Sequence, residues 1–280
     1  MNRPAITALA VVLAALAAPW LAPHDPMNPA TLDLADALTP PAFLPDGDWR
    51  FPLGTDGQGR DILSAILYGA RLSFLVGALS VALAVAVGVP AGLAAGYAGG
   101  LLDILLMRLA DAQLSVPAML LALLADGCVR ALLPRAAWPA AALPILVLAI
   151  GLARWPQIAR VVRSAAILER SRDYVAAARL LGRSAPRIAL VHVLPNVLGP
   201  VVVLATLSLG FAVLDEAALS FLGVGLPPTR PSLGTLIRLG NEELLSGQWW
   251  VALFPALALA LPILAINLAG DAARDRLDLR

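Results

Sequence analysis

Residues 72–102 read LSFLVGALSVALAVAVGVPAGLAAGYAGGLL, and this stretch contains no charged side chain. A helix that crosses the hydrocarbon core of a bilayer, about 30 Å thick, needs about 20 apolar residues, so the stretch is long enough to span a membrane. Over all 280 residues, apolar side chains make up 60% and charged side chains 14%. Soluble proteins carry about 25% charged residues. We therefore predict an all-α polytopic membrane protein surrounded by lipid; its net charge of +1 favours no nucleic-acid partner.

Further apolar stretches raise the predicted number of transmembrane helices to about six. They are residues 4–24, 104–125, 136–153, 188–214 and 244–270. The 104–125 stretch carries Arg108 and Asp111, which lie on one helical face and can pair near the headgroups.

The predicted spans divide the chain into parts. These are a first transmembrane helix 1–24, an external loop 25–70, a transmembrane domain 71–270 and a tail 271–280. The first part has an alternative interpretation, because a charged start, an apolar run and Ala15-Leu16-Ala17 resemble a secretory signal peptide. The apolar run is long for a signal peptide, so we favour a retained helix.

The arginines predict the orientation. Between residues 154 and 187 there are eight arginines and only two acids, Glu169 and Asp173. Loops rich in arginine stay in the cytoplasm. Counting spans from there predicts that both termini are cytoplasmic and that the loops 23–71, 126–137 and 215–248 are external.

The predicted cytoplasmic segment 154–195 has the pattern of a helix, a break and a second helix. Asp173 suits the first turn of a short helix, and Gly182 is placed to end it. We expect three residues to form one stripe along it: Tyr174, Ala178 and Leu181. Two interpretations stay open from the residues alone: a basic helix on anionic headgroups, or a plug in the groove of a partner protein.

The segment resembles the cytoplasmic "EAA" loop of ABC importer permeases. That motif has Glu-Ala-Ala, three residues, Gly, then nine residues before Ile-x-Leu-Pro. The matching positions here are Ala177, Ala178, Gly182, Leu194 and Pro195. Ala176 takes the place of the Glu and His192 that of the Ile.

Other short motifs resemble the second ("C-type") permease of the dipeptide/oligopeptide/nickel branch, in the same order along the chain. They are Leu53-Gly54-Thr55-Asp56 with Gly59-Arg60-Asp61, Tyr68-Gly69-Ala70-Arg71, Gly96-Tyr97-Ala98-Gly99-Gly100, Leu219-Ser220-Phe221-Leu222-Gly223 with Pro227-Pro228, and Asn267-Leu268 with Gly270-Asp271. The resemblance covers the chain from about residue 50 to residue 278.

The resemblance implies a type I ABC importer permease fold in a bacterial cytoplasmic (inner) membrane. The implied partners are a homologous permease, two ATPase subunits that bind ATP and magnesium, and an external substrate-binding protein. The implied substrates are di- or oligopeptides, with nickel or a nickel chelate as the alternative. A coupling helix near 172–181 would sit in the ATPase groove, and the residues expected to couple are Asp173, Tyr174, Ala177, Ala178, Arg179, Gly182, Leu194 and Pro195.

Candidate residues outside the coupling loop are acids and arginines. We expect Arg60, Asp61 and Arg71 to fix the entry of the loop into the second span or to contact the binding protein. Asp56 is a further candidate for an external or binding-protein contact. Asp215 and Glu216 follow a long apolar run, so they are candidates for the translocation path, or are simply hydrated at the boundary.

The absence of certain residue types from the sequence argues against several enzymatic functions. There is no lysine, hence no phosphate-binding loop of the Gly-x-x-x-x-Gly-Lys-Ser/Thr type, so ATP hydrolysis belongs on another polypeptide. The two histidines, His24 and His192, are expected on opposite sides of the membrane, which disfavours a metal site or a histidine base for a membrane hydrolase. We therefore predict no catalytic, cofactor or metal site here; a membrane enzyme or a self-gated channel are the rival classes.

Overall fold

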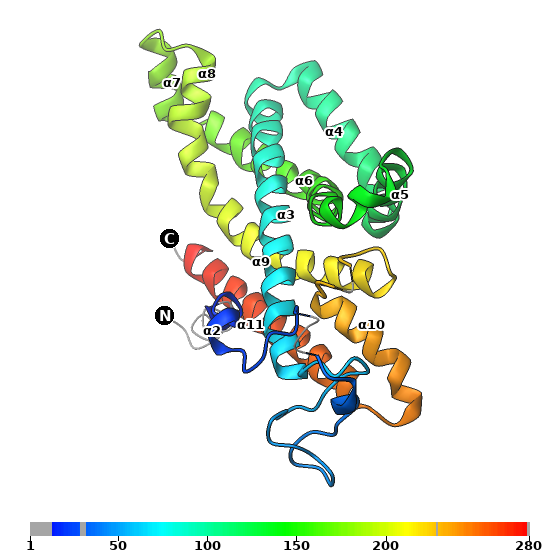
Figure 1. The fold of residues 1–280 in the computed structure, drawn as a ribbon. Helices are drawn as coiled ribbons and strands as arrows, with labels where there is room; N and C mark the ends of the chain where they lie inside the picture. Colours follow the sequence, from blue (N-terminus) through cyan, green and yellow to red (C-terminus); the bar gives the residue numbers. More distant parts are fainter. Residues whose placement is uncertain (1–12, 29–31, 228, 279–280) are drawn as a thin grey trace.

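The computed structural model describes residues 13–28, 32–227 and 229–278, and the side chains of these as far as residue 272. Its principal helices are α2 (Ala18–Leu21), α3 (Ile62–Ala98), α4 (Gly100–Leu114), α5 (Ala118–Leu132), α6 (Trp138–Arg170), α7 (Asp173–Leu180), α8 (Ala185–Ile188), α9 (Leu194–Phe221), α10 (Leu233–Glu243) and α11 (Trp250–Asp278). A π-helical turn, Ala189–Val193, joins α8 to α9. Figure 1 shows α3 running through the middle of the molecule, with α7 and α8 at one end and the loop before α3 at the opposite end.

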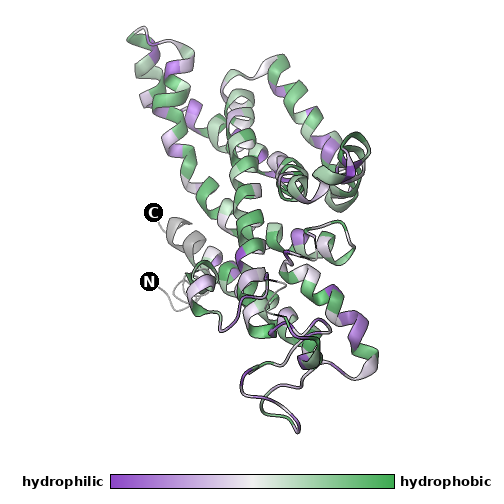
Figure 2. Cartoon of the chain, in the orientation of Figure 1, coloured by the Kyte–Doolittle hydropathy of each residue, from purple (hydrophilic) through white to green (hydrophobic). Residues whose placement is uncertain are grey.

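Within the described residues, four helical runs are long and apolar enough to cross a membrane. They are Ile62–Ala98, Arg135–Arg170, Ala185–Phe221 and Trp250–Ala272. A fifth crossing exists if α4 and α5, which are bent by 90°, count as one span. The predicted first span, 4–24, begins outside the described residues, and its described part holds the short α2. Figure 2 shows apolar residues along most of α3, and polar residues near α7, in α10 and in the loop before α3.

Helix α3 begins ten residues before the predicted span 72–102, which corrects the boundary of the predicted loop 25–70. The Asp61 side chain accepts a hydrogen bond from the backbone N–H of Ser64 at 3.0 Å, and so caps the helix. The helix ends at Gly99, whose φ of +70° is a left-handed conformation that favours glycine.

The predicted span 104–125 is not one straight helix. Helix α4 ends at Leu114, and Pro117 stands at the N-cap of α5. Proline disfavours helical geometry in the residue before it, which accounts for a break at this point. Arg108 and Asp111 are not paired with each other as expected; Asp111 instead lies 2.5 Å from Arg160 of α6.

Helix α6 is much longer than the predicted span 136–153, because it continues to Arg170. The first half of the predicted loop 154–195 is therefore helix, and the true connection comprises residues 171–184, including α7. We call residues 171–184 the α7 elbow. The loop was overestimated because Arg154, Arg160 and Arg163 interrupt the apolar pattern, while each pairs with an acid on a neighbouring helix.

Two further boundaries differ from the sequence prediction. Helix α9 continues to Phe221, so the predicted outer loop 215–248 begins later. The predicted span 244–270 starts with a separate turn that ends at Gly247, and α11 then runs from Trp250 through much of the predicted tail.

Close packing of α3 against α6 and α9 forms the core. Val89 and Leu93 of α3 share a buried cluster with Ile158 of α6 and Val197 of α9. A β-carbon on Gly92 would lie 2.3 Å from the Ala159 carbonyl oxygen, so only glycine allows this approach of the two backbones. Small residues along α3 therefore bring the long helices together.

Candidate functional site

The α7 elbow ends its short helix as the sequence predicts. Gly182 has a φ of +72°. The N–H of Arg183 donates to the Ala178 carbonyl at 3.2 Å, and the N–H of Gly182 donates to the Arg179 carbonyl at 3.0 Å. This pair of bonds is a Schellman motif, which satisfies the last carbonyls of the helix.

Of the expected stripe of Tyr174, Ala178 and Leu181, only Ala178 is buried within the chain. Val175 and Ala178 are the buried residues, and they join a cluster with Ile188 and Val193. Leu181 is 79% exposed and Tyr174 is 38% exposed. Packing against α8 and the π-helical turn buries the face that holds Val175 and Ala178.

The opposite face of α7 is exposed. It carries Asp173, Ala176, Ala177 and Leu180, at the spacing of one helical stripe. Leu180 is 90% exposed. The two matched motif alanines are thus divided, because Ala177 lies on the exposed face and Ala178 on the buried face. Apart from Asp173 at its start, this exposed stripe, with Leu181 beside it, is a small apolar surface.

A hydrogen-bonded clasp ties α7 to both neighbouring helices. The Tyr174 hydroxyl donates to Glu169 Oε2 of α6 at 2.5 Å, and Asn196 Nδ2 of α9 donates to the Tyr174 hydroxyl at 3.1 Å. Asn196 Nδ2 also donates to the carbonyl of His192 in the π-helical turn at 2.8 Å. Burial and the hydrogen bond to Glu169 raise the pKa of the Tyr174 phenol. We call Tyr174, Glu169 and Asn196 the tyrosine clasp.

Sequence reasoning singled out Tyr174 but assigned no role to Glu169 or Asn196. Asn196 directly follows the motif residues Leu194 and Pro195, which open α9. Its position next to these motif residues was the only sign in the sequence that Asn196 belongs to the elbow region. Arg179, another expected coupling residue, stands over the Tyr97 ring of α3 at 5.9 Å.

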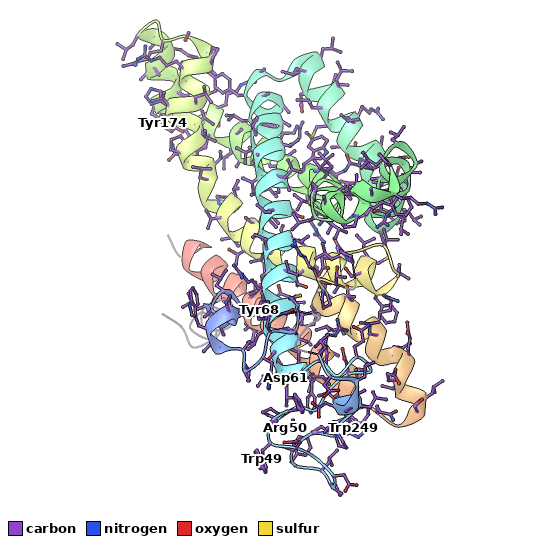
Figure 3. All side chains as sticks on the ribbon, in the orientation of Figure 1. Trp49, Arg50, Asp61, Tyr68, Tyr174 and Trp249 are labelled. Atoms are coloured by element: carbon purple, nitrogen blue, oxygen red, sulfur yellow. The ribbon has the colours of Figure 1, made fainter. Side chains whose placement is uncertain are left out.

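At the opposite end, Asp56, Arg60 and Asp61 are all buried. Arg60 Nε donates to Asp56 Oδ2 at 2.7 Å, and Trp250 Nε1 of α11 donates to the Thr55 carbonyl at 3.3 Å. Together with the Asp61 cap, these contacts hold residues 32–61, which we call the loop segment, onto α3 and α11. Figure 3 places Asp61, Arg50 and Trp249 at this end and Tyr174 at the other.

Asp215 and Glu216 lie inside α9, before its end, and contact different helices. Asp215 Oδ2 accepts from Arg154 Nη2 of α6 at 2.5 Å. Glu216 is fully buried and accepts from Ser73 Oγ of α3 at 2.7 Å and from Ser220 Oγ at 2.6 Å. Sequence reasoning named the two acids, whereas their partners Arg154 and Ser73 come from distant parts of the chain.

The histidines lie at opposite ends of the helical body. His24 Nδ1 is 3.5 Å from Asp61 Oδ2, and the His192 carbonyl belongs to the π-helical turn beside Tyr174. In the described part of the chain, no group of three histidine, cysteine or acidic side chains could hold a metal ion.

Long apolar helices, arginine–acid pairs between them and a short elbow helix that projects from one end are the features of a polytopic helical membrane protein. A solved structure of the MetNI methionine ABC transporter, in inward-facing conformations, contains a chain of this fold. The TM-score is 0.60 at 22% identity, over 76% of the present chain and 97% of that chain.

The family model described as binding-protein-dependent transport system inner membrane component matches residues 88–280, and the chain belongs to that family. The di/tripeptide transport system permease protein DppC of Pseudomonas aeruginosa (strain UCBPP-PA14) is 43% identical over 270 residues, which are 96% of this chain and 84% of that protein. The dipeptide transport system permease protein DppC of Escherichia coli (strain K12) is 41% identical over 282 residues, covering 99% and 89% of the two chains.

Proposed function

We propose that the chain is the membrane-spanning permease subunit of an ATP-driven importer for di- or oligopeptides. One observation carries the proposal: its similarity to two peptide-transport permeases extends over nearly the whole chain. The nickel alternative is less favoured, because both relatives are named for peptide transport. The proposed complex contains a homologous permease, two ATPase subunits that bind ATP and magnesium, and an external binding protein that delivers the substrate.

In this proposal the α7 elbow lies on the cytoplasmic side, and the loop segment lies outside. The arginine-rich stretch that ends α6 and continues through the elbow supports this orientation, in which both termini would be cytoplasmic. An exposed apolar stripe at a water-facing end of the molecule is the feature expected of a protein contact.

Coupling then follows from the geometry of the elbow. The exposed stripe with Ala177 and Leu180 sits in a groove of the ATPase, while Val175 and Ala178 attach α7 to α8 and α9. The tyrosine clasp connects the same helix to α6 and α9. ATP binding shifts the transporter between two states only if these contacts differ in free energy between the states.

The acids of α9 take different roles in the proposal. The Asp215 side chain is 35% exposed beside Arg154, so this pair can face the translocation path. Glu216 is fully buried, and its two hydroxyl partners give it an internal role in joining α9 to α3. The loop-segment residues Asp56, Arg60 and Asp61 hold that segment in place; a binding protein would touch its exposed surface instead.

Cysteine crosslinking tests the coupling surface. Cys128 is exposed and is first replaced by serine. Ala177→Cys should then crosslink to a cysteine in the ATPase groove, whereas Ala178→Cys, on the buried face, should crosslink far less. Equal crosslinking at both positions, or none at Ala177→Cys in a transporting complex, would contradict the proposed docking face.

Uptake tests the substrate. Cells that lack this gene and its redundant peptide transporters are complemented with the wild-type chain or with an empty vector. The wild-type chain should restore uptake of labelled dialanine, whereas uptake of radioactive nickel should stay unchanged. Restoration of nickel uptake alone would support the alternative substrate and refute peptide import.

A further inference from the structure

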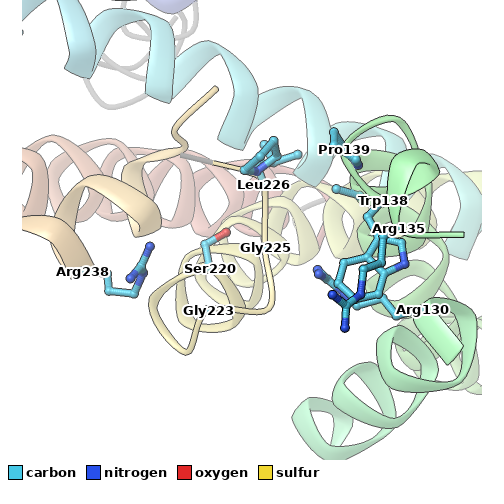
Figure 4. Close-up of a pocket in the computed structure, with 11 residues that line it drawn as sticks. Arg130, Arg135, Trp138, Pro139, Ser220, Gly223, Gly225, Leu226 and Arg238 are labelled. Atoms are coloured by element: carbon cyan, nitrogen blue, oxygen red, sulfur yellow. The ribbon is translucent and has the colours of Figure 1, made fainter. Parts of the chain in front are cut away.

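Three arginine side chains from separate segments line one cavity of about 270 Å3. Arg130 comes from α5, Arg135 from the turn before α6, and Arg238 from α10. Trp138 and Ser220 also line the wall. Figure 4 shows Arg130, Arg135 and Trp138 together on one side, with Ser220 and Arg238 across from them.

The charges around this arginine cavity do not balance. Arg130 Nε donates to Asp126 Oδ2 at 2.6 Å, and Arg238 Nη1 lies 3.4 Å from Glu242 Oε1, whose side chain is 62% exposed. Arg135 forms no ion pair within the described part of the chain. Two of the three guanidinium groups at the wall thus have a carboxylate partner, whereas that of Arg135 has none in the described part of the chain.

One donor at the wall is also unused. Arg238 Nε is buried and has no hydrogen-bond partner in the described structure. A buried N–H without an acceptor costs free energy, so such groups point to a missing partner. An oxygen anion in the cavity would supply an ion-pair partner for Arg135, and it would reach Arg238 Nε, which is closed to solvent, only after a shift of that side chain.

The arginines are held in place before any ligand arrives. The guanidinium carbons of Arg130 and Arg135 stand over the Trp138 ring, 5.4 Å and 6.0 Å from its centroid. Ser220 Oγ donates to Glu216, so this part of the wall is fixed to the buried carboxylate of α9. Guanidinium groups bind carboxylates through paired hydrogen bonds, and preorganised groups lose less entropy on binding.

We propose that the arginine cavity is a carboxylate subsite that receives the free C-terminal carboxylate of a peptide on its way through the permease. This inference rests on the proposed function. The volume lies near the lower end of the roughly 300–1,000 Å3 of small-molecule sites, so the cavity suits a dipeptide or one end of a longer peptide. In the proposed orientation, the start of α6 and the end of α9 place it toward the external side.

Protection of a cysteine measures the binding directly. Pro139→Cys is made at an exposed residue of the cavity wall, in a Cys128→Ser background, and the complete permease–ATPase complex is placed in phosphatidylcholine nanodiscs without binding protein. Dialanine at about three times its Kd should slow maleimide labelling about fourfold. Dialanine amide, which has no free carboxylate, should leave the rate unchanged.

Arginine variants identify the groups responsible. Arg135→Gln and Arg238→Gln should each abolish protection by dialanine. Arg230→Gln is the matched control, because Arg230 is exposed in the same region and does not line the cavity. It should retain the wild-type protection. Equal loss in all three variants would indicate a general charge effect and overturn the assignment.

The remaining outcomes separate the possible sources of an anion. If adding phosphatidylglycerol to the nanodiscs slows labelling without peptide, the cavity binds a lipid phosphate and the proposal is wrong. The proposal is also overturned if dialanine and its amide protect the cysteine equally, if neither protects it, or if the reagent cannot reach the cysteine. The proposed function fails separately, if the wild-type complex with its binding protein imports no dialanine into proteoliposomes.

Discussion

The two ends of this molecule are held to the rest of the chain in different ways. In the loop segment 32–61, Arg60 and Asp56 are buried and pair with each other. The same segment exposes apolar side chains, since Leu34 is 76%, Phe43 61% and Trp49 80% exposed. In the α7 elbow, apolar groups are exposed, and Leu180 is 90% accessible. A buried ion pair thus stabilises the loop segment from within the chain, whereas the exposed leucines of the elbow form the surface for which we propose a partner.

The largest effect is expected from breaking the buried ion pair of the loop segment. Arg60→Ala removes the partner of Asp56 and leaves a carboxylate in a site closed to water, which should cost about 3–5 kcal/mol of the free energy of unfolding. Thermal unfolding in detergent measures this loss. Arg50→Ala is the control, because Arg50 also pairs with aspartates but its side chain is 62% exposed. A similar drop in both variants would show that burial does not distinguish the two sites.

Next, two glycines with nearly equal backbone angles sharpen the comparison. Gly59 and Gly182 have φ values of +73° and +72°, but a β-carbon on Gly59 would lie 2.2 Å from the Asp33 carbonyl oxygen, whereas Gly182 has open space. Gly182→Ala should cost about 1–2 kcal/mol for the left-handed conformation alone. Gly59→Ala should cost about 1–3 kcal/mol more because of crowding. Equal shifts in Tm would contradict the tight packing of the loop segment.

Exposed leucines at the α7 elbow should affect assembly and leave the fold intact. The double change Leu180→Ser with Leu181→Ser should weaken copurification of the ATPase subunits by about 30-fold, which corresponds to a contact worth about 2 kcal/mol. The Tm of the isolated chain should not fall. Leu245→Ser is the matched control, since Leu245 is 98% exposed but lies far along the chain, between α10 and α11. Normal copurification of the double variant would refute a partner contact here.

The smallest expected effect concerns the tyrosine clasp. Tyr174→Phe removes the hydroxyl that joins Glu169 to Asn196, at a cost of about 1 kcal/mol to folding. Because the pKa of the Tyr174 phenol is raised above its ordinary value near 10, the folded chain holds this proton more tightly than the unfolded chain. The stabilisation by Tyr174 should therefore be constant at neutral pH and should decline above a pH of about 10. Unfolding of both chains over that range measures it, and a decline already at neutral pH would contradict the assignment.

The positions of helices could be predicted from the sequence where a long apolar stretch or a glycine marks them. Residues 72–102 lie almost entirely in α3, and Gly182 ends α7 as its position in the pattern indicates. Prediction failed where charged residues lie inside helices. Arg154 was assigned to a cytoplasmic loop, yet it lies within α6 and pairs with Asp215. A charge in a sequence does not reveal whether a distant helix will neutralise it.

At the predicted coupling site, too, the sequence identified the residues, but the structure determined which of them are buried. The motif residues Ala177 and Ala178 were recognised from spacing, but only packing against Ile188 decides that one is exposed and the other buried. The loop residues Asp56, Arg60 and Asp61 were candidates for partner contacts, and the structure buries them as an internal connection. Periodicity identifies a stripe on a helix, and the neighbouring helices determine which stripe faces inward.

The sequence by itself determined that this chain is a helical membrane protein and that it resembles importer permeases. These properties follow from apolar content and from motifs a few residues long, which are local. The tertiary structure alone decided the tyrosine clasp, the buried partners of Glu216 and the arginine cavity, because each includes at least one side chain that lies tens of residues away from the others. Their meeting depends on how α3, α6 and α9 pack, and helix packing is set by the shape of whole surfaces, which no single segment encodes.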